Sequence, residues 1–69
     1  MPMTGKELRA LREKAGATQV DLAEGLMLGR DAGRVAVSRW ENGHVAIREQ
    51  NARLARKFLS DFAKAARGN

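Results

Sequence analysis

The side chains best suited to recognise another molecule lie close together between positions 34 and 39, where Arg34, Ser38 and Arg39 occur. Arginine can donate paired hydrogen bonds to guanine O6 and N7 or bind a phosphate, and serine can reach either kind of group. Val37 and Trp40, at a three-residue spacing, would lie on the other side of a helix formed by this segment. The pattern predicts an amphipathic helix that buries Val37 and Trp40 and presents the polar side chains to a nucleic acid.

A shorter helix upstream is expected to hold this segment in place. Thr18 can cap its first N–H groups, and Asp21, three residues later, suits the positive end of the helix dipole. Its apolar face is formed by Leu22, Ala23 and Leu26, and the small Ala23 allows a crossing helix to come near. We expect the two helices to pack against each other across a turn.

Two further helices are expected around this pair. The first runs from a cap at Thr4, with Glu7 completing a capping box, to about Ala15, and Gly16 ends it. The last covers about residues 47–66, where apolar positions recur near a 3.6-residue period without glycine or proline. The expected main core combines apolar residues from all four helices: Leu8, Leu11, Leu22, Ala23, Leu26, Val37, Trp40, Ile47 and Leu54.

These segments together resemble the lambda-repressor/Cro-type helix-turn-helix family of DNA-binding proteins. The resemblance covers roughly residues 6–47 and depends on several anchors in order, which are Leu11-Arg12-Glu13-Lys14-Ala15-Gly16, Thr18-Gln19, Leu22-Ala23-Glu24, Val37-Ser38 and Glu41-Asn42-Gly43. It implies a compact all-α, lambda-repressor-like fold with a long C-terminal helix. Residues 1–69 would form one domain, with the motif at about 18–43 and the C-terminal helix at about 47–66.

The chain departs from the family in the turn. The family usually has about six residues between the positions of Leu26 and Val37, whereas ten lie between them here. The additional residues are expected to lengthen the turn around residues 28–31, because loop insertions cost little closure entropy. The cap of the recognition helix is then either Gly33, counting back from Val37, or Asp31, which is the better capping residue.

The resemblance implies that four residues of the recognition helix can contact bases. Arg34 and Arg39 match positions from which family members reach base edges, although an arginine can also simply bind phosphate. Val35 can touch a thymine methyl group, and Ser38 can reach a base or a phosphate, with plain solvent exposure as the alternative for both. We expect base contacts from all four.

Phosphate contacts are expected from four other side chains. Gln19 matches the family's residue that binds the backbone and braces the recognition helix, and Asn42 matches the phosphate ligand that follows that helix. Asn42-Gly43 should also end the recognition helix as a left-handed cap. His44 and Arg30 lie in adjoining turns and are expected to add contacts, with simple solvation as their alternative.

Two other sets of residues have structural roles in this interpretation. Relatives have a salt bridge at the positions of Arg12 and Glu41, which joins the first helix to the end of the recognition helix and fixes geometry more than it adds stability. In the C-terminal helix, Phe58, Leu59 and Phe62 are expected to remain uncovered and to form the interface of a homodimer. The alternative is that they complete the core of one chain.

The distribution of charge supports a polyanionic partner. Residues 1–33 carry five basic and five acidic side chains, whereas residues 34–69 carry eight basic and three acidic ones. The net charge of +5 therefore comes from the recognition helix and the segment that follows it.

Other classes of protein are disfavoured. With no cysteine and one histidine, no metal site, cofactor or catalytic constellation is expected, and the chain is not predicted to be an enzyme. The apolar segments are far shorter than the roughly 20 residues that span a bilayer, and no signal-peptide pattern is visible, so a cytoplasmic location is expected. Binding of the basic C-terminal helix to a membrane surface is also disfavoured, because Glu49 and Asp61 interrupt it.

The sequence thus predicts a transcription regulator that binds an operator with an inverted repeat in double-stranded DNA. The family suggests a dimeric autorepressor of a small phage, prophage or plasmid operon, of the kind also found beside anti-CRISPR genes. The alternative is an antitoxin that binds a toxin protein as well as its own operator.

Overall fold

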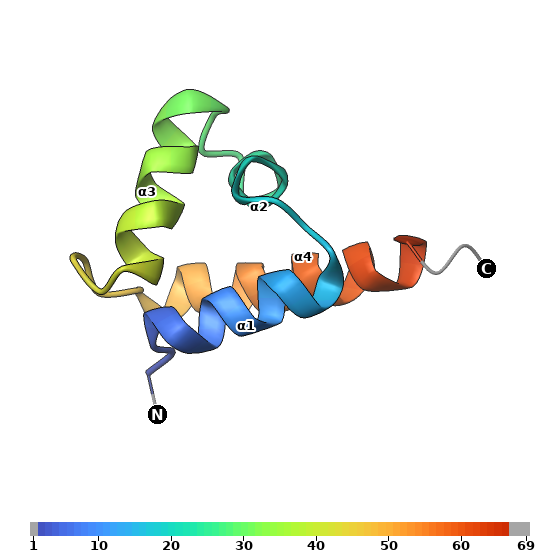
Figure 1. Cartoon of the computed structure of the whole chain (residues 1–69), viewed down its shortest axis with the longest axis horizontal. Coiled ribbons are helices and arrows are strands. Elements are labelled where there is room, and N and C mark those ends of the chain that lie inside the picture. Colours follow the sequence, from blue (N-terminus) through green and yellow to red (C-terminus); the bar gives the residue numbers. More distant parts are fainter. Residues whose placement is uncertain (1, 67–69) are drawn as a thin grey trace.

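The computed structural model describes residues 2–66, which form four helices and no strand. They are α1 (Gly5–Ala15), α2 (Gln19–Gly25), α3 (Asp31–Glu41) and α4 (Glu49–Ala66). Figure 1 shows α1 and α4 side by side along the long dimension of the molecule, with α2 and α3 standing over them. The predicted all-α helix-turn-helix architecture is therefore confirmed. Over residues 2–66, no helix is both long enough and apolar enough to cross a membrane.

The first two helices begin at the predicted caps. Thr4 Oγ1 accepts a hydrogen bond from Glu7 N at 3.1 Å, and the Glu7 carboxylate accepts one from Thr4 N at 3.3 Å. The same reciprocal arrangement joins Thr18 and Asp21, at 3.0 and 2.8 Å. Each pair satisfies backbone N–H groups that would otherwise lack a partner at the start of the helix.

Helices α2 and α3 cross at a point where both have small residues. Gly33 of α3 is buried against Ala23 of α2, and a Cβ atom at position 33 would lie 2.7 Å from the Ala23 Cβ. It would also lie 2.9 Å from the Cβ of Leu28 in the turn. The prediction that Ala23 lets a crossing helix come near is confirmed, and Gly33 contributes equally to the close approach.

The start of α3 differs from the prediction. Only residues 26–30 separate α2 from α3, so the additional residues do not simply lengthen the turn. Instead Asp31 is the first residue of the helix, and Arg30 occupies the cap position with no side-chain hydrogen bond. Neither Gly33 nor Asp31 is the cap, because Gly33 has to lie within the helix to pack against α2. The insertion therefore extends α3 at its N-terminal end.

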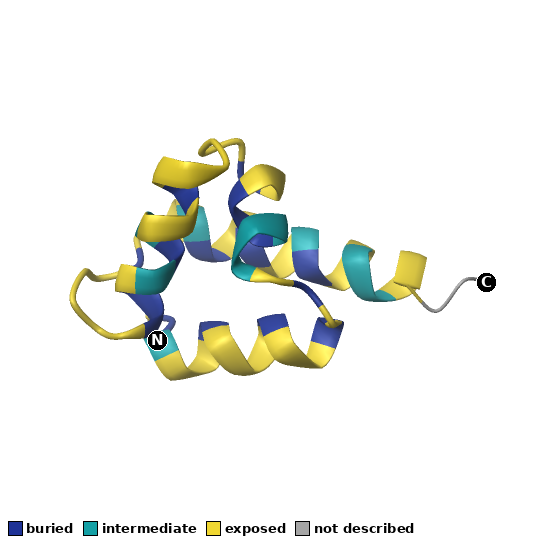
Figure 2. Cartoon of the chain, turned by 45° about the horizontal axis from the view of Figure 1, so that its top comes forward, coloured by how far each residue is buried: buried dark blue, intermediate teal, exposed yellow. Residues whose placement is uncertain are grey.

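The core lies between the α1–α4 layer and the α2–α3 layer, where the dark-blue buried segments of Figure 2 face one another. Leu8, Leu22 and Val37 are fully buried, and Trp40 is 8% exposed, so its predicted core role is confirmed. Leu11 was expected in this core but is 37% exposed. It lies at the side of α1, between the buried stripe and solvent.

Helix α4 faces the core with a different side from the one predicted. It begins at Glu49, two residues after the expected start, and its buried residues are Ala52, Ala55 and Leu59. Leu54 is 46% exposed and is not part of the core. Since successive helical residues are about 100° apart, the buried face is rotated by about one residue from the predicted one. Two alanines allow α4 to approach its neighbours closely, which a leucine at the same place would prevent.

The rotation of α4 also changes the roles expected for the aromatic segment. Leu59 is 3% exposed within a single chain, so the prediction that it remains uncovered for a dimer interface is wrong. Phe58 is half-buried with its ring against Gly25 of α2, where a Cβ atom would collide with it. Phe62 is also half-buried, and the two phenyl rings are 5.6 Å apart at a tilt of 48°. These residues largely cover the core of their own chain.

Candidate nucleic-acid interface

Helix α3 is anchored through one side and exposes the other. Val37 and Trp40 lie in the core. Arg34, Val35 and Arg39 are exposed, and Ser38 is half-buried. Because each residue advances the helix by about 100°, Arg34, Ser38, Val35 and Arg39 fall within one arc of about 140°. The structure thus brings together, on one free face, the four residues that were predicted to contact bases.

A buried ion pair fixes the C-terminal end of this helix. Arg12 Nε donates to Glu41 Oε2 at 2.6 Å and Arg12 Nη2 donates to Glu41 Oε1 at 3.0 Å, which is the paired geometry preferred by guanidinium and carboxylate. The Arg12 and Glu41 side chains are only 11% and 2% exposed. Arg12 Nη1 also donates to the Ala17 carbonyl oxygen at 3.0 Å. The pair implied by the resemblance is therefore present, and it ties α1 to both α3 and the segment before α2.

The same carboxylate also holds α2. Gln19 Nε2 donates to Glu41 Oε1 at 3.2 Å, so the side chain at the first position of α2 braces the last residue of α3. The hydrogen bonds from Arg12 to Glu41 raise the pKa of the Arg12 guanidinium above its usual value, because they favour its charged form. An amide nitrogen carries two hydrogens, so the contact with Glu41 is compatible with the predicted contact between Gln19 and a phosphate.

Beside Gln19 lies a surface hollow with a basic lining that includes Arg9 and Arg34. Arg9 is exposed and pairs with Glu13 at 3.6 Å across the surface of α1. Arg9 was not among the residues predicted from the sequence to bind DNA, although its position three residues before Arg12 places the two on neighbouring parts of one helix face. Arg9 thus joins the set of cations that a phosphate beside Gln19 could approach.

The other predicted phosphate ligands lie at the two ends of α3. Arg30 is exposed at the N-terminal cap position, and Asn42 and His44 are exposed after the C-terminal end. Asn42 Nδ2 donates to Ser38 Oγ at 3.3 Å, and the His44 backbone N–H donates to the Arg39 carbonyl oxygen at 2.9 Å. The 11 residues of α3 span about 16 Å, so these groups flank the exposed arc on both sides.

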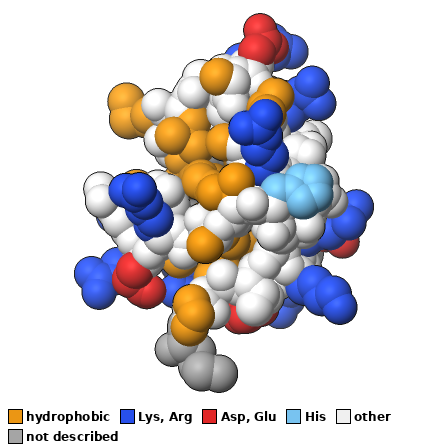
Figure 3. All heavy atoms as spheres, turned by 90° about the vertical axis from the view of Figure 1, so that its left-hand side faces the viewer, with side chains coloured by type: hydrophobic (Ala, Val, Ile, Leu, Met, Phe, Trp, Pro, Cys, Tyr) orange, Lys and Arg blue, Asp and Glu red, His pale blue; other side chains and the backbone are white. Residues whose placement is uncertain are grey.

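The space-filling view in Figure 3 looks onto the side of the molecule where α3 and its following segment lie. Lys and Arg side chains project from several parts of this face, and the histidine lies among them. Exposed apolar groups on the same elements include Val35, at 42%, and Val45, at 47%. A mixture of cations, hydroxyl and amide groups with a few methyl groups suits both the phosphates and the base edges of a DNA groove.

Comparison with known proteins gives one match that bears on this geometry. A helix-turn-helix family model of the lambda-repressor type matches residues 8–60, which include most of α1, all of α2 and α3, and much of α4. No curated protein and no solved structure matches the chain.

Proposed function

Since the chain belongs to the lambda-repressor-type helix-turn-helix family and is thus a DNA-binding transcription regulator, we propose that it is a dimeric repressor acting on its own operator. The observation that carries the proposal is the exposed arc of α3, which is held rigidly from behind and flanked by polar groups at both ends. In this proposal the repressor acts by occupying DNA and so excluding polymerase. The natural setting is a small phage, prophage or plasmid operon, including one that carries anti-CRISPR genes.

In the proposed complex, α3 enters the major groove and its exposed arc faces the base edges. Arg34 and Arg39 each pair with a guanine, Val35 contacts a thymine methyl group, and Ser38 reaches a base or a nearby phosphate. The buried contacts of Glu41 keep this arc in a single orientation, because they hold α3 from two other helices.

Backbone phosphates on either side of the groove are bound by a second set of groups. Gln19 and Arg9 bind on the side of α2, Arg30 binds beside the start of α3, and Asn42 and His44 bind beyond its end. Contacts of this kind set the register of the protein on DNA without reading sequence. They also make binding dependent on salt, since each neutralised phosphate releases counterions.

The proposal includes a two-fold dimer, because one recognition helix reads only a few base pairs. A second copy would bind a half-site about 34–36 Å away, one helical turn of DNA. The half-buried edge formed by Phe58 and Phe62 supports this arrangement, since part of both rings is still accessible. A chain of this length buries only about 60% of its unfolded surface, so a second subunit would also add stability.

A footprint on the DNA immediately upstream of the gene tests the proposal. We expect protection of an inverted repeat, with an affinity that falls steeply between low and physiological salt. Affinity that does not change with salt would contradict DNA binding through these cations. A protein that stays monomeric by sedimentation, both free and on DNA, would contradict the dimer. Copurification with the product of a neighbouring gene would instead favour the antitoxin alternative.

A further inference from the structure

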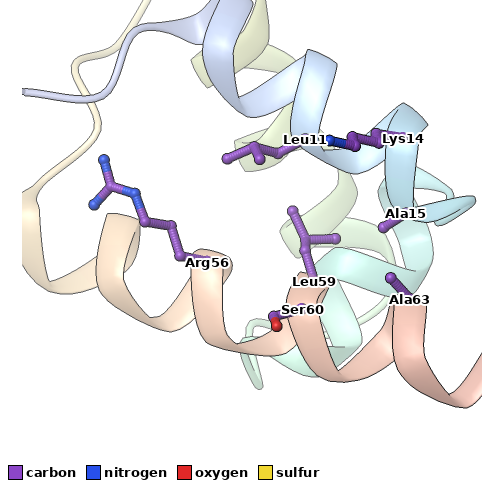
Figure 4. Close-up of a pocket in the computed structure, with 7 residues that line it drawn as sticks. All are labelled: Leu11, Lys14, Ala15, Arg56, Leu59, Ser60 and Ala63. Carbon is purple, nitrogen blue, oxygen red and sulfur yellow. The ribbon is translucent and has the colours of Figure 1, made fainter.

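A groove between α1 and α4 is not used by the proposed DNA interface. Its walls are apolar, with Leu11 and Ala15 from α1 facing Leu59 and Ala63 from α4, and its volume is about 330 Å³. In Figure 4, Leu59 points toward Leu11 and Ala63 points toward Ala15. Leu59 and Ala15 are buried and form the floor, whereas Leu11 is 37% exposed at the rim.

The groove continues past Leu11 along α1. A second hollow on the other side of this leucine is lined by Glu7 and Ala10 together with residues of the first hollow. Residues 7 to 15 of a helix extend over about 12 Å, which is slightly more than two helical turns. An apolar groove of this length, with a leucine projecting into it, matches the face of a short amphipathic helix.

The charged side chains around the groove favour a partner of one sign of charge. The charged residues that line the first hollow are Lys14 and Arg56, and both are exposed. Both also line the second hollow, where Glu7 is the one acidic residue of the lining, so the cations lie beside Leu11 in both hollows and outnumber the carboxylate. A second copy packed groove to groove would place four cations and only two carboxylates around the shared apolar surface, and this excess of like charge opposes association. A helix that carries carboxylates beside its apolar residues would meet the cations with opposite charge.

The groove also lies away from the proposed DNA interface. Leu11 and Lys14 are two and five residues after Arg9, which places them about 200° and 140° around α1 from Arg9. Arg9 borders the hollow beside Gln19 and Arg34 on the DNA-facing side. A partner in the groove would therefore leave α3 and the start of α2 accessible to DNA.

We propose that the α1–α4 groove is a docking site for an amphipathic helix of another protein, in which acidic residues flank an apolar anchor. The anchor packs beside Leu11 on the floor formed by Leu59 and Ala15, and the flanking carboxylates pair with Lys14 and Arg56. The regulator can hold this partner while it is bound to DNA, because the two surfaces lie on opposite sides of α1. This site goes beyond the proposed repressor function and does not depend on the identity of the operator.

Selection from a library of helix-constrained peptides tests the proposal on the full chain. Peptides selected on the wild-type protein are expected to carry a leucine-like anchor flanked by Glu or Asp, and to shift the NMR signals of Leu11, Ala15 and Ala63. On a Lys14→Glu, Arg56→Glu double variant, the same library should instead enrich Lys and Arg beside the anchor, and the acidic peptides should bind at least tenfold more weakly. Lys57→Glu, on an exposed position of α4 outside the groove, serves as the matched control and should retain the acidic preference.

Three outcomes would overturn the proposal. One is that the wild type and the double variant enrich peptides of the same charge, which would show that Lys14 and Arg56 do not determine the charge of the bound helix. The second is binding that shifts signals of α3 instead of the groove. The third is concentration-dependent shifts of Leu11 in the protein alone, which would identify a second copy as the occupant. A Lys14→Gln, Arg56→Gln variant guards against misfolding of the charge-reversed protein and should lose the acidic preference without gaining a basic one.

Discussion

Helices α3 and α4 are both amphipathic, but they are held in the fold by different kinds of contact. Helix α3 is fixed by large buried side chains, Val37 and Trp40. It is also fixed by the Glu41 carboxylate, which accepts hydrogen bonds from side chains of α1 and α2. Helix α4 is fixed by a stripe of small residues, Ala52 and Ala55, followed by one leucine.

This difference explains why the two helices present their remaining side chains so differently. In α3 the large apolar residues Val37 and Trp40 both face the core, so its exposed arc is mostly polar, with Val35 as the apolar member, and is suited to DNA. In α4 the core takes alanines, and larger apolar residues such as Leu54 and Phe58 are left at its sides. Close packing between helices favours small residues at the point of nearest approach, whatever the size of the residues nearby.

The largest expected effect comes from breaking the charged contact that is specific to α3. Glu41→Ala leaves the buried Arg12 without its partner and should lower the free energy of unfolding by about 3–5 kcal/mol, measured by urea denaturation. Glu13→Ala removes the exposed partner of Arg9 and is the matched control, with an expected loss of less than about 1 kcal/mol. Equal losses in the two variants would show that burial of the Arg12–Glu41 pair has no special weight.

The pH dependence of this contact follows from the direction in which folding shifts the pKa of Arg12. The folded protein raises the pKa of Arg12, so the stabilisation is fully present below the unfolded-state pKa of arginine and is lost only as the pH rises through the higher folded-state value. We therefore expect the difference in stability between Glu41→Gln and the wild type to show no titration of Arg12 between neutral and moderately alkaline pH.

The packing of α4 is tested by enlarging a buried side chain and shortening the exposed one next to it in the sequence. Ala55→Leu should destabilise the protein by about 1–3 kcal/mol, because the site is buried and α4 would have to move outward. Leu54→Ala, at the adjacent exposed position, should change stability by no more than about 0.5 kcal/mol. The reverse ranking in thermal or urea denaturation would mean that α4 faces the core with the side first expected from its sequence.

The exposed arc of α3 is tested by its effect on DNA specificity. Arg39→Ala should cost about 1–3 kcal/mol of binding free energy and relax the preference at one base pair in each half-site. Gln19→Ala should weaken binding to all sequences alike, because phosphates carry no sequence information. Binding measurements on operators with single substitutions separate the two patterns. A uniform loss in Arg39→Ala would identify Arg39 as a phosphate ligand.

The smallest expected effect concerns the additional N-terminal residues of α3. Asp31 lies in the first turn, where a negative charge interacts favourably with the helix dipole, so Asp31→Ala should cost about 0.3–1 kcal/mol. Asp61 of α4 lies before the last turn, and its replacement by alanine should have no such effect. Thermal denaturation at low salt measures the effect of each substitution on stability. An unchanged stability in Asp31→Ala would argue that α3 begins later than Asp31.

Features that depend on neighbouring residues were predictable from the sequence. The caps at Thr4 and Thr18 join residues three positions apart, and Gly16 and Gly43, with φ angles of 80° and 77°, end α1 and follow α3 as expected. The exposed arc of α3 was also predictable, because its large apolar residues recur on the opposite side. These features depend on backbone geometry within one or two turns, which the local sequence specifies.

Other features were decided only by the tertiary structure. The link between Arg12 and Glu41 spans 29 residues, so the resemblance to a family implied it but no local pattern did. The start of α3 before Gly33, the exposed position of Leu11 and the buried stripe of alanines in α4 all depend on how near another helix comes. The sequence pattern predicts the buried face of a helix from the hydrophobicity of its residues. Close packing between two helices instead requires small residues at the contact, and in α4 these two requirements favour different faces.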